Sequence, residues 1–308
     1  MDKNEKKLLE EISGLHDIPQ AGVFNIRENG KLLKRNVDSE VNIVSKKNKD
    51  GIDIIVKPNT VNKSVHIPVI VSMGGINDIV YNDFYIGDNC DILIVAGCGI
   101  HNASNKQSSH NGIHSFHIGK NCKIRYVEKH FAIGNKKVQK ILNPTTKISV
   151  GENSVFEMET LQKGGVTYAN RNTVANLKEN SKLLIRENIL TTDTDIAITK
   201  FKVTLSGDNS RVEVVSRAVA KDSSKQSFVS NVIGESGCFG HVECDGILSG
   251  GAIIESTPKI VAKSPESMLV HEAAIGKISE DQQNKLMTLG LSKEEAEAII
   301  IDGFLSGN

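Results

Sequence analysis

Residues 86–90 read IGDNC, and the same pattern returns at residues 118–122 as IGKNC. Four further versions follow: VGENS at 150–154, LKENS at 177–181, SGDNS at 206–210 and IGESG at 233–237. Successive units begin 32, 32, 27, 29 and 27 residues apart. A pattern that recurs at such a period indicates a stacked repeat, in which each unit packs on its neighbours.

Each unit is followed by a run with β character, and none contains a convincing helix. Residues 91–97 read DILIVAG and residues 211–219 read RVEVVSRAV, both rich in β-branched side chains. Gly and Asn in the motif suit left-handed corner conformations, and Val, Ile and Leu can fill the interior as ladders. We therefore predict a parallel β-helix over about residues 65–260, with a β-sandwich as the alternative.

The two ends of the chain carry different patterns. Residues 1–16 place apolar side chains at helical spacing, so we expect a helix there. Extended runs at 41–44 and 52–56 flank the sequence KKNKDG, which predicts a hairpin with a solvated tip.

The C-terminal part switches to a helical period. SEDQ at residues 279–282 and SKEE at 292–295 both match a capping box, in which Ser caps a backbone N–H and the fourth residue bonds back. Gly290 stands where a helix should stop. We therefore expect two helices, over about residues 280–289 and 293–302.

Composition excludes several classes of protein. The 308 residues include 37 Lys and Arg and 37 Asp and Glu, and this zero net charge argues against nucleic acid as the main partner. No apolar run is long enough to span a membrane, and the charged N-terminus lacks the apolar core of a signal peptide. Five Cys form no regular framework and are interpreted as reduced thiols. We expect a cytoplasmic protein.

Cys244 follows a strand-like run, and His271 and Glu272 form an adjacent pair further along the chain. A thiolate, an imidazole and a carboxylate together suit iron or an iron–sulfur cluster. The alternative is a small buried Cys244, a hydrogen-bonded core His271 and a carboxylate, Glu272, at the start of a helix.

A second stretch, from Cys98 to His130, is rich in His and Cys. On a strand, His114 and His117 face opposite sides, so a compact zinc site is not expected there. Polar side chains that line the surface or a tunnel of the solenoid are the favoured interpretation. The other cysteines lie in the repeat motifs or next to them and are interpreted as structural: Cys90, Cys122 and Cys238.

The chain lacks the phosphate-binding Walker A sequence, because LSGGA at 248–252 has neither the Lys nor the Ser or Thr that it requires. We therefore expect no ATP hydrolysis and no enzymatic activity in this chain. One alternative is a carbohydrate-active β-helix enzyme that uses Asp193 and Asp195 as paired carboxylates, although TTDTD also suits a polar turn. Another is a non-catalytic interaction module.

HEAAIGKI at 271–278, SEDQ at 279–282 and GLSKEEAEAIIIDGF at 290–304 occur in one order and at fitting spacing. Together they resemble the C-terminal signature of the SufB/SufD family, the scaffold proteins of the SUF iron–sulfur assembly system. ECDGILSGGA at 243–252 resembles the family's strand with the cluster-assembly cysteine. The chain is shorter than typical members and is similar to the compact scaffold of minimal two-component systems.

This resemblance implies a mainly β fold with a right-handed parallel β-helix core and terminal helices. It suggests an N-terminal segment at 1–62, the β-helix core at 63–262, and a C-terminal helical segment at 263–308 that docks a SufC-like ATPase. It also implies a homodimer that assembles a transient [4Fe-4S] cluster at its interface and passes it to recipient apoproteins.

The resemblance further suggests the residues of the site. Cys244 of one subunit would face the partner's His271 and Glu272 as cluster ligands. VAGCGIHN at 95–102 resembles the segment with the sulfur-accepting cysteine, which makes Cys98 the candidate sulfur acceptor. Its loop is longer and the usual proline is absent, so free sulfide is the alternative to persulfide from a cysteine desulfurase.

Overall fold

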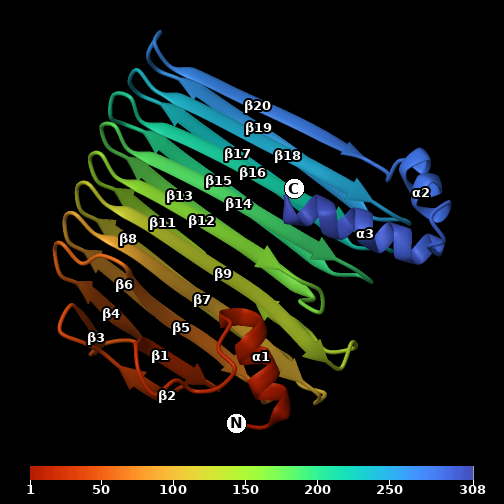
Figure 1. Ribbon diagram of the computed structural model, residues 1–308, viewed down its shortest axis with the longest axis horizontal. Coiled ribbons are helices and arrows are strands. Elements are labelled where there is room, and N and C mark those ends of the chain that lie inside the picture. Colours follow the sequence, from red (N-terminus) through yellow and green to blue (C-terminus); the bar gives the residue numbers. More distant parts are fainter. Residues whose placement is uncertain (308) are drawn as a thin grey trace.

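The computed structural model describes residues 1–307, and in it the chain winds back and forth between two sheets as a stack of coils (Figure 1). Sheet A runs in the order β2 (Lys31–Asn36), β1 (Val23–Glu28), β5 (Lys63–Val71), β7 (Asp91–Asn102), β9 (Lys123–Gly134), β12 (Val155–Gln162), β14 (Lys182–Thr191), β16 (Arg211–Ala220), β18 (Phe239–Leu248) and β20 (Met268–Gly276). Sheet B runs in the order β19 (Ile253–Ala262), β17 (Lys225–Gly234), β15 (Ile196–Leu205), β13 (Tyr168–Leu177), β10 (Lys140–Leu142), β8 (Ser108–Ile118), β6 (Asn77–Ile86), β4 (Gly51–Val56) and β3 (Val41–Ser45), while β11 (Thr145–Val150) pairs with β8 and β13.

From β5 to β20 the neighbouring strands of each sheet are parallel, which confirms the predicted parallel β-helix. Antiparallel pairing occurs at the N-terminal end, where β1 pairs with β2 and β3 with β4. The β3–β4 pair is the hairpin expected around KKNKDG. The long strands stay in unbroken register over ten residues, as in β14 with β16, because each coil repeats the corner of the one before.

The repeated Asn forms these corners. Asn89, Asn121 and Asn153 have φ values of 58°, 56° and 55°, in the left-handed region that Asn tolerates better than most residues. The side chains also stack, since Asn121 Nδ2 donates to Asn89 Oδ1 at 3.0 Å and Asn89 Nδ2 donates to Asn59 Oδ1 at 3.0 Å. One residue type therefore satisfies both the backbone conformation and the contact with the next coil.

The residue after each corner Asn is buried, and at Cys90 and Cys122 it secures the turn to a neighbouring coil. Cys90 Sγ donates to the carbonyl oxygen of Lys57 at 3.2 Å, and Cys122 Sγ donates to that of Gly87 at 3.2 Å. These positions agree with the structural role predicted for both cysteines. Cys238 is likewise buried after a corner.

Inside the coils, side chains alternate between the core and the outer surface, as expected for strands with one buried face. Apolar residues fill most of the interior, including a stack in which the rings of Phe84 and Phe116 lie 4.3 Å apart and Phe156 packs edge-on against Phe116. The burial of this continuous apolar core is the main stabilising contribution to the fold.

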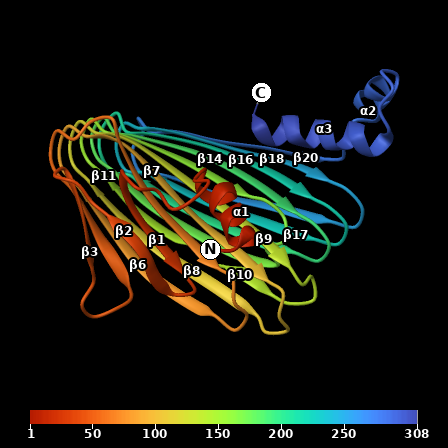
Figure 2. The ribbon, with the colours of Figure 1, turned by 60° about the horizontal axis from the view of Figure 1, so that its bottom comes forward.

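Helix α1 (Lys3–Ser13) covers the outer face of sheet A near its N-terminal end (Figure 2). Leu8 and Ile12 are fully buried against β7. Gly97 permits this approach, because a Cβ there would lie 2.6 Å from the Ile12 carbonyl oxygen. The predicted N-terminal helix is confirmed.

Two helices end the described chain, α2 (Glu280–Met287) and α3 (Lys293–Ser306). Ser292 forms the predicted capping box with Glu295. The capping box predicted at Ser279 is wrong, since its side chain makes no cap hydrogen bond, and the carboxylate of the next residue, Glu280, pairs with Lys277. None of the helices in residues 1–307 is long and apolar enough to cross a membrane.

Helix α3 lies against the outer face of sheet A near the C-terminal end (Figure 2). Arg217 of β16 donates to the carbonyl oxygen of Phe304 at 2.9 Å, and Lys221 pairs with Glu297 at 2.7 Å. The domain boundary expected at residue 262 falls between β19 and β20, so the last strand lies in the segment expected to be helical.

Candidate functional site

Cys244 lies near the C-terminal end of the solenoid, on β18, with its side chain in the interior. It is 5% exposed, pairs in register with Ser216 of β16 and Ala273 of β20, and belongs to the apolar core cluster. Burial raises the pKa of the Cys244 thiol to about 12. In the described structure the thiol is therefore protonated at neutral pH.

His271 and Glu272 lie on β20, not at the start of a helix, which corrects the alternative considered for Glu272. His271 pairs in register with the buried Val242, so it faces the interior like Cys244. Both of its ring nitrogens are buried without a hydrogen-bond partner. Burial lowers the pKa of His271, which favours the neutral ring that can bind a metal.

Glu272 faces the opposite side of β20. Its side chain is 66% exposed, and its Oε2 lies 3.6 Å from Nε2 of His241. The chain therefore brings Cys244 and His271 to the same side of the last coils and places Glu272 on the other. Within residues 1–307, no three His, Cys, Asp or Glu side chains are close enough together to hold a metal ion.

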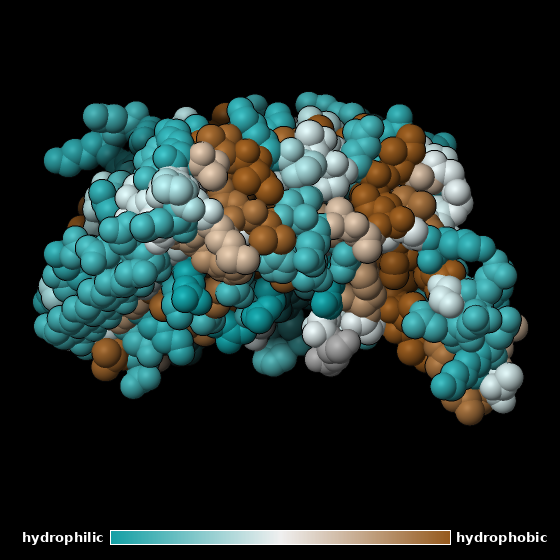
Figure 3. All heavy atoms as spheres, turned by 90° about the horizontal axis from the view of Figure 1, so that it is seen from above, coloured by the Kyte–Doolittle hydropathy of each residue, from teal (hydrophilic) through white to brown (hydrophobic). Residues whose placement is uncertain are grey.

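The last coil is also an uncovered end of the solenoid. Figure 3 views the molecule from this side and shows apolar groups among the polar ones. Large apolar side chains on the last strand of each sheet are exposed, namely Ile253, Ile260, Met268 and Ile275. Because β20 and β19 are the end strands of their sheets, their outer edges carry backbone groups that a further strand can pair with.

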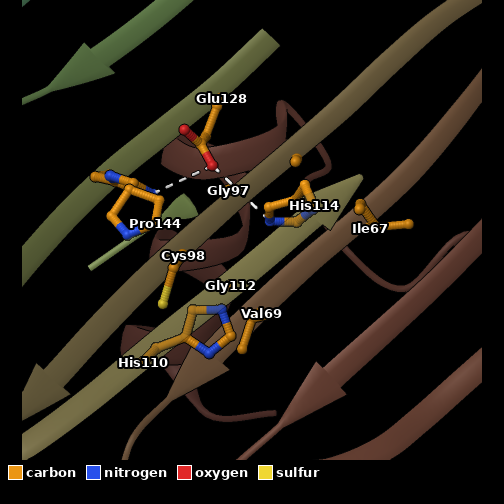
Figure 4. Close-up of a pocket in the computed structure, with 11 residues that line it drawn as sticks. Ile67, Val69, Gly97, Cys98, His110, Gly112, His114, Glu128 and Pro144 are labelled. Atoms are coloured by element: carbon orange, nitrogen blue, oxygen red, sulfur yellow. Dashed lines mark ion pairs between the residues drawn. The ribbon is translucent and has the colours of Figure 1, made fainter. Parts of the chain in front are cut away.

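A second group of polar side chains lies deep in the solenoid around Cys98. A cavity of about 10 Å³, enough for one water-sized group, is lined by Cys98, His110, His114, Glu128 and His130 (Figure 4). Burial raises the pKa of the Cys98 thiol well above its usual value. The sequence-predicted acceptor is therefore a neutral thiol that is 2% exposed.

The charges beside this cavity are paired. Arg171 of β13 forms ion pairs with Glu128 and with Glu187, whose Oε2 lies 3.2 Å from Arg171 Nε. Burial alone would raise the pKa of Glu128, but Arg171 and two neighbouring histidines hold it at about 2. Burial lowers the pKa of His114 to about 4 and of His130 to about 3, so both rings are neutral at physiological pH.

A single row of inward-facing polar residues connects the two cysteine-containing regions of sheet A. Strand register places them one after another from β9 to β18, and all are buried: Glu128, Thr160, Glu187, Ser216 and Cys244. Sequence analysis named only the last of these. Alternation within each strand marks the row as inward-facing, but strand register is needed to show that its members are neighbours.

The structure also places the other predicted residues. His114 is buried, whereas His117 faces outward and stacks on Tyr85 with ring centroids 5.0 Å apart, so the two face opposite sides as predicted. Asp193 lies at the corner between β14 and β15 with a φ of 53°, as a polar turn residue does. Asp195 is buried at the same corner, and burial raises its pKa to about 6.

The family model for the SufBD core domain, described as SUF system FeS cluster assembly, matches residues 84–304. An iron–sulfur cluster assembly SufBD family protein of Methanocaldococcus jannaschii is 28% identical over 243 residues, covering 78% of this chain and 76% of that protein. A SufBD family protein of Pyrococcus horikoshii is 30% identical over 233 residues, covering 75% of this chain and 69% of that protein.

A third SufBD family protein, from Archaeoglobus fulgidus, is 29% identical over 228 residues, which cover 73% of this chain but 60% of that relative. The matched region of this chain includes both cysteine-containing regions, the last strand and helix α2. The chain therefore belongs to the SufBD family of iron–sulfur cluster assembly proteins.

Proposed function

We propose that this protein is a scaffold on which an iron–sulfur cluster is assembled by two copies of the chain, and that it is not itself an enzyme. The observation that carries the proposal is the pair Cys244 and His271 on the last coils. Both face the interior there, and both ring nitrogens of His271 lack a partner. A buried polar group without a partner costs free energy, which a bound metal would offset.

The three candidate ligands supply different chemistry. Cys244 would bind iron as a thiolate, and because its pKa is about 12 in the free protein, the thiol proton would leave as iron binds. Neutral His271 would offer a nitrogen, and Glu272 a hard oxygen suited to Fe(II). A transient [4Fe-4S] cluster held partly by nitrogen and oxygen would pass to recipient apoproteins more readily than one held by four thiolates.

Glu272 faces away from Cys244 within one protomer, which favours a site shared between two. We infer a homodimer with an isologous interface formed by the uncovered β19–β20 end. The exposed Met268 and Ile275 at this end would become buried in such a contact. Cys244 of one subunit would then lie near the partner subunit's His271 and Glu272.

Helices α2 and α3 suit a different partner. Leu289 is 77% exposed and Ile299 is 50% exposed, so the helix pair presents apolar side chains away from the solenoid. An exposed apolar helix surface of this kind can fill a groove on another protein. We infer that a SufC-like ATPase docks here and supplies the ATP hydrolysis for which this chain has no motif.

Cys98 is proposed as the acceptor of persulfide sulfur from a cysteine desulfurase. The alternative is free sulfide that enters the cluster directly, without an acceptor cysteine. The buried polar row from Glu128 to Cys244 supports a link between the two regions, because it provides hydrogen-bonding groups along the solenoid. Assembly of this kind, with a soluble ATPase and soluble recipients, would take place in the cytoplasm.

Mixed dimers test whether the site is shared. One subunit carries Cys244→Ser and the other His271→Ala, each with a different affinity tag, so that tandem purification isolates the mixed species. In a shared arrangement, one of its two sites keeps both ligands, and the mixed dimer should bind about half the iron and sulfide of wild type. A site built within one subunit predicts instead that the mixed dimer binds the average of the two variant homodimers.

A further inference from the structure

The interior of the solenoid holds a His–Asp pair that the proposed cluster site does not use. His110 of β8 and Asp78 of β6 lie opposite each other in register and are 6% and 5% exposed. His110 Nδ1 lies 2.9 Å from Asp78 Oδ2. Arg27 of β1 fixes the other carboxylate oxygen, since its Nη2 donates to Asp78 Oδ1 at 3.2 Å and to the Gly30 carbonyl oxygen at 2.7 Å.

This geometry determines which nitrogen of His110 carries the proton. Burial alone would raise the pKa of Asp78, but His110 and Arg27 lower it below its usual value, so the carboxylate is ionised at neutral pH. An ionised carboxylate only accepts hydrogen bonds, and Nδ1 of His110 must therefore donate. When the ring carries a single proton, Nε2 is therefore left as the acceptor.

The free nitrogen lies at the cavity that Cys98 also lines. A Cβ placed on Gly112, which forms part of the cavity wall, would lie 3.4 Å from His110 Nε2. Figure 4 shows the Cys98 side chain directed toward the His110 ring. Cys98 lies on sheet A and His110 on sheet B, so the two sheets bring a thiol, an imidazole and a carboxylate together across the solenoid interior.

We propose that Asp78 and His110 form a proton-accepting dyad that activates the Cys98 thiol for reaction with a persulfide-class sulfur donor. This inference rests on the proposed role of Cys98 as the sulfur acceptor. A thiolate is the reactive form of cysteine, and a neutral buried thiol requires a base within reach. His110 supplies the base, and Asp78 is the positioning residue that holds the ring in the required tautomer and stabilises the imidazolium.

The transfer step balances without an external oxidant or reductant. His110 Nε2 takes the thiol proton, and the Cys98 sulfur attacks the outer sulfur of a donor R–S–S⁻. The S–S bond of the donor breaks as a new S–S bond forms on Cys98. The leaving thiolate takes the proton from His110, which gives R–SH and a Cys98 persulfide anion.

His114 also faces the cavity, and its buried Nδ1 lacks a hydrogen-bond partner.

The charged groups around the dyad are paired with one another, and the other histidines at the cavity are neutral at physiological pH. Arg27 pairs with Asp78, and Arg171 of β13 pairs with Glu128 of β9, so these charges are matched. His114 on β8 and His130 on β9 stay neutral at physiological pH because burial keeps the pKa of each at about 4 or below. The remaining wall contributed by β5 is apolar, with Ile67 and Val69.

The test measures persulfide formation on Cys98 in the full-length reduced protein, with inorganic polysulfide as the anaerobic sulfur donor. Mass spectrometry of the Cys98 peptide gives the rate over a range of pH. Asp78→Asn keeps the size of the side chain but donates to Nδ1, which moves the ring proton to Nε2 and removes the base. His110→Gln removes the base directly, and His117→Gln on the outer face of the same strand is the matched control.

We expect both dyad variants to react on the order of 100-fold more slowly than wild type at neutral pH, since general base catalysis contributes at least that much. Their deficit should shrink as rising pH ionises more of the thiol without help. His117→Gln should react like wild type. If His110→Gln does not fold, Asp78→Asn carries the test alone.

Two results overturn the dyad while leaving Cys98 as the acceptor. One is equal rates for wild type and both variants. The other is a deficit that keeps the same size at every pH in variants with the wild-type melting temperature. A wild-type protein in which Cys98 gains no sulfur overturns both the dyad and the acceptor role. Cluster assembly at Cys244 from free sulfide is measured separately and would not be affected.

Discussion

Replacing Arg171 by Met tests how the buried charges of the solenoid interior are held. The Arg171 guanidinium pairs with Glu128 and Glu187, which are 2% and 3% exposed. Met has a similar length but no charge, so both carboxyl groups would lose their buried cation. Removing one partner of a buried ion pair costs about 3–5 kcal/mol, because the other charge stays in a low-dielectric environment.

The pKa of Glu128 gives a second way to obtain the free-energy cost of removing Arg171. The pKa of Glu128 falls from 4.5 to about 2 in the folded protein, although burial opposes this and Arg171 is the largest favourable cause. At 1.36 kcal/mol per pKa unit, this shift corresponds to stability on the order of 3 kcal/mol, to which Arg171 and the two neighbouring histidines contribute together. Both routes predict that Arg171→Met loses a few kcal/mol, on the order of 3 kcal/mol, at pH 7.

The pH dependence has a defined sign. A carboxyl group whose folded pKa lies below its unfolded pKa stabilises the fold above the unfolded value, and this stability is lost as pH falls toward the folded value. Wild type should therefore lose stability between about pH 4.5 and pH 2. Without Arg171, burial raises the pKa of Glu128, so the variant should gain relative stability as its carboxyl groups are protonated.

Urea denaturation of wild type and Arg171→Met at pH 7 and pH 4.5 measures both effects. The difference in unfolding free energy should be large at pH 7 and smaller at pH 4.5. Arg125→Met is the control, because Arg125 pairs with Glu159 at the surface, with side-chain exposures of 52% and 34%, and should cost less than 1 kcal/mol. A difference below about 1 kcal/mol that does not change with pH would refute the reasoning.

Two further predictions concern the corners and the C-terminal helices. In thermal melts, Asn121→Ala should lower the unfolding free energy by about 1–2 kcal/mol more than Asn121→Gly. The reason is that the backbone at φ 56° is strained for Ala and unstrained for Gly. Equal losses would show that only the hydrogen bonds of the Asn side-chain ladder matter. Deleting residues 279–308 should abolish co-purification of a SufC-like ATPase while the solenoid stays folded. Survival of the complex after this deletion would show that the ATPase docks elsewhere.

The corners and the strand alternation were predictable because they are local properties. Asn89 and Asn121 recur at a fixed period, and the left-handed conformation that Asn tolerates sets the turn. The capping box at Ser292 was predictable for the same reason. At Ser279 the same pattern failed, since nothing in the four letters SEDQ reveals that Lys277 pairs with Glu280.

The interior charges could not be predicted, because they depend on long-range register. Arg171 and Glu128 are 43 residues apart, and their contact follows from how β13 of sheet B faces β9 of sheet A. The pairing of His110 with Asp78 likewise needs the 32-residue coil between them. A helix start was one interpretation of Glu272, and only the pairing of β20 with β18 shows that His271 and Glu272 face opposite sides of a strand.

The most direct test of the proposed function is the iron and acid-labile sulfide bound by the anaerobically purified full-length protein after reconstitution with Fe(II) and sulfide. Wild type should bind both, Cys244→Ser should lose most of the cluster absorbance, and His271→Ala should lose part of it, while each variant remains folded. Cys90→Ser should keep the cluster and lose some thermal stability, because the Cys90 thiol bonds to a corner carbonyl. A Cys244→Ser protein that binds iron and sulfide like wild type would contradict the assignment of the cluster to this end of the solenoid.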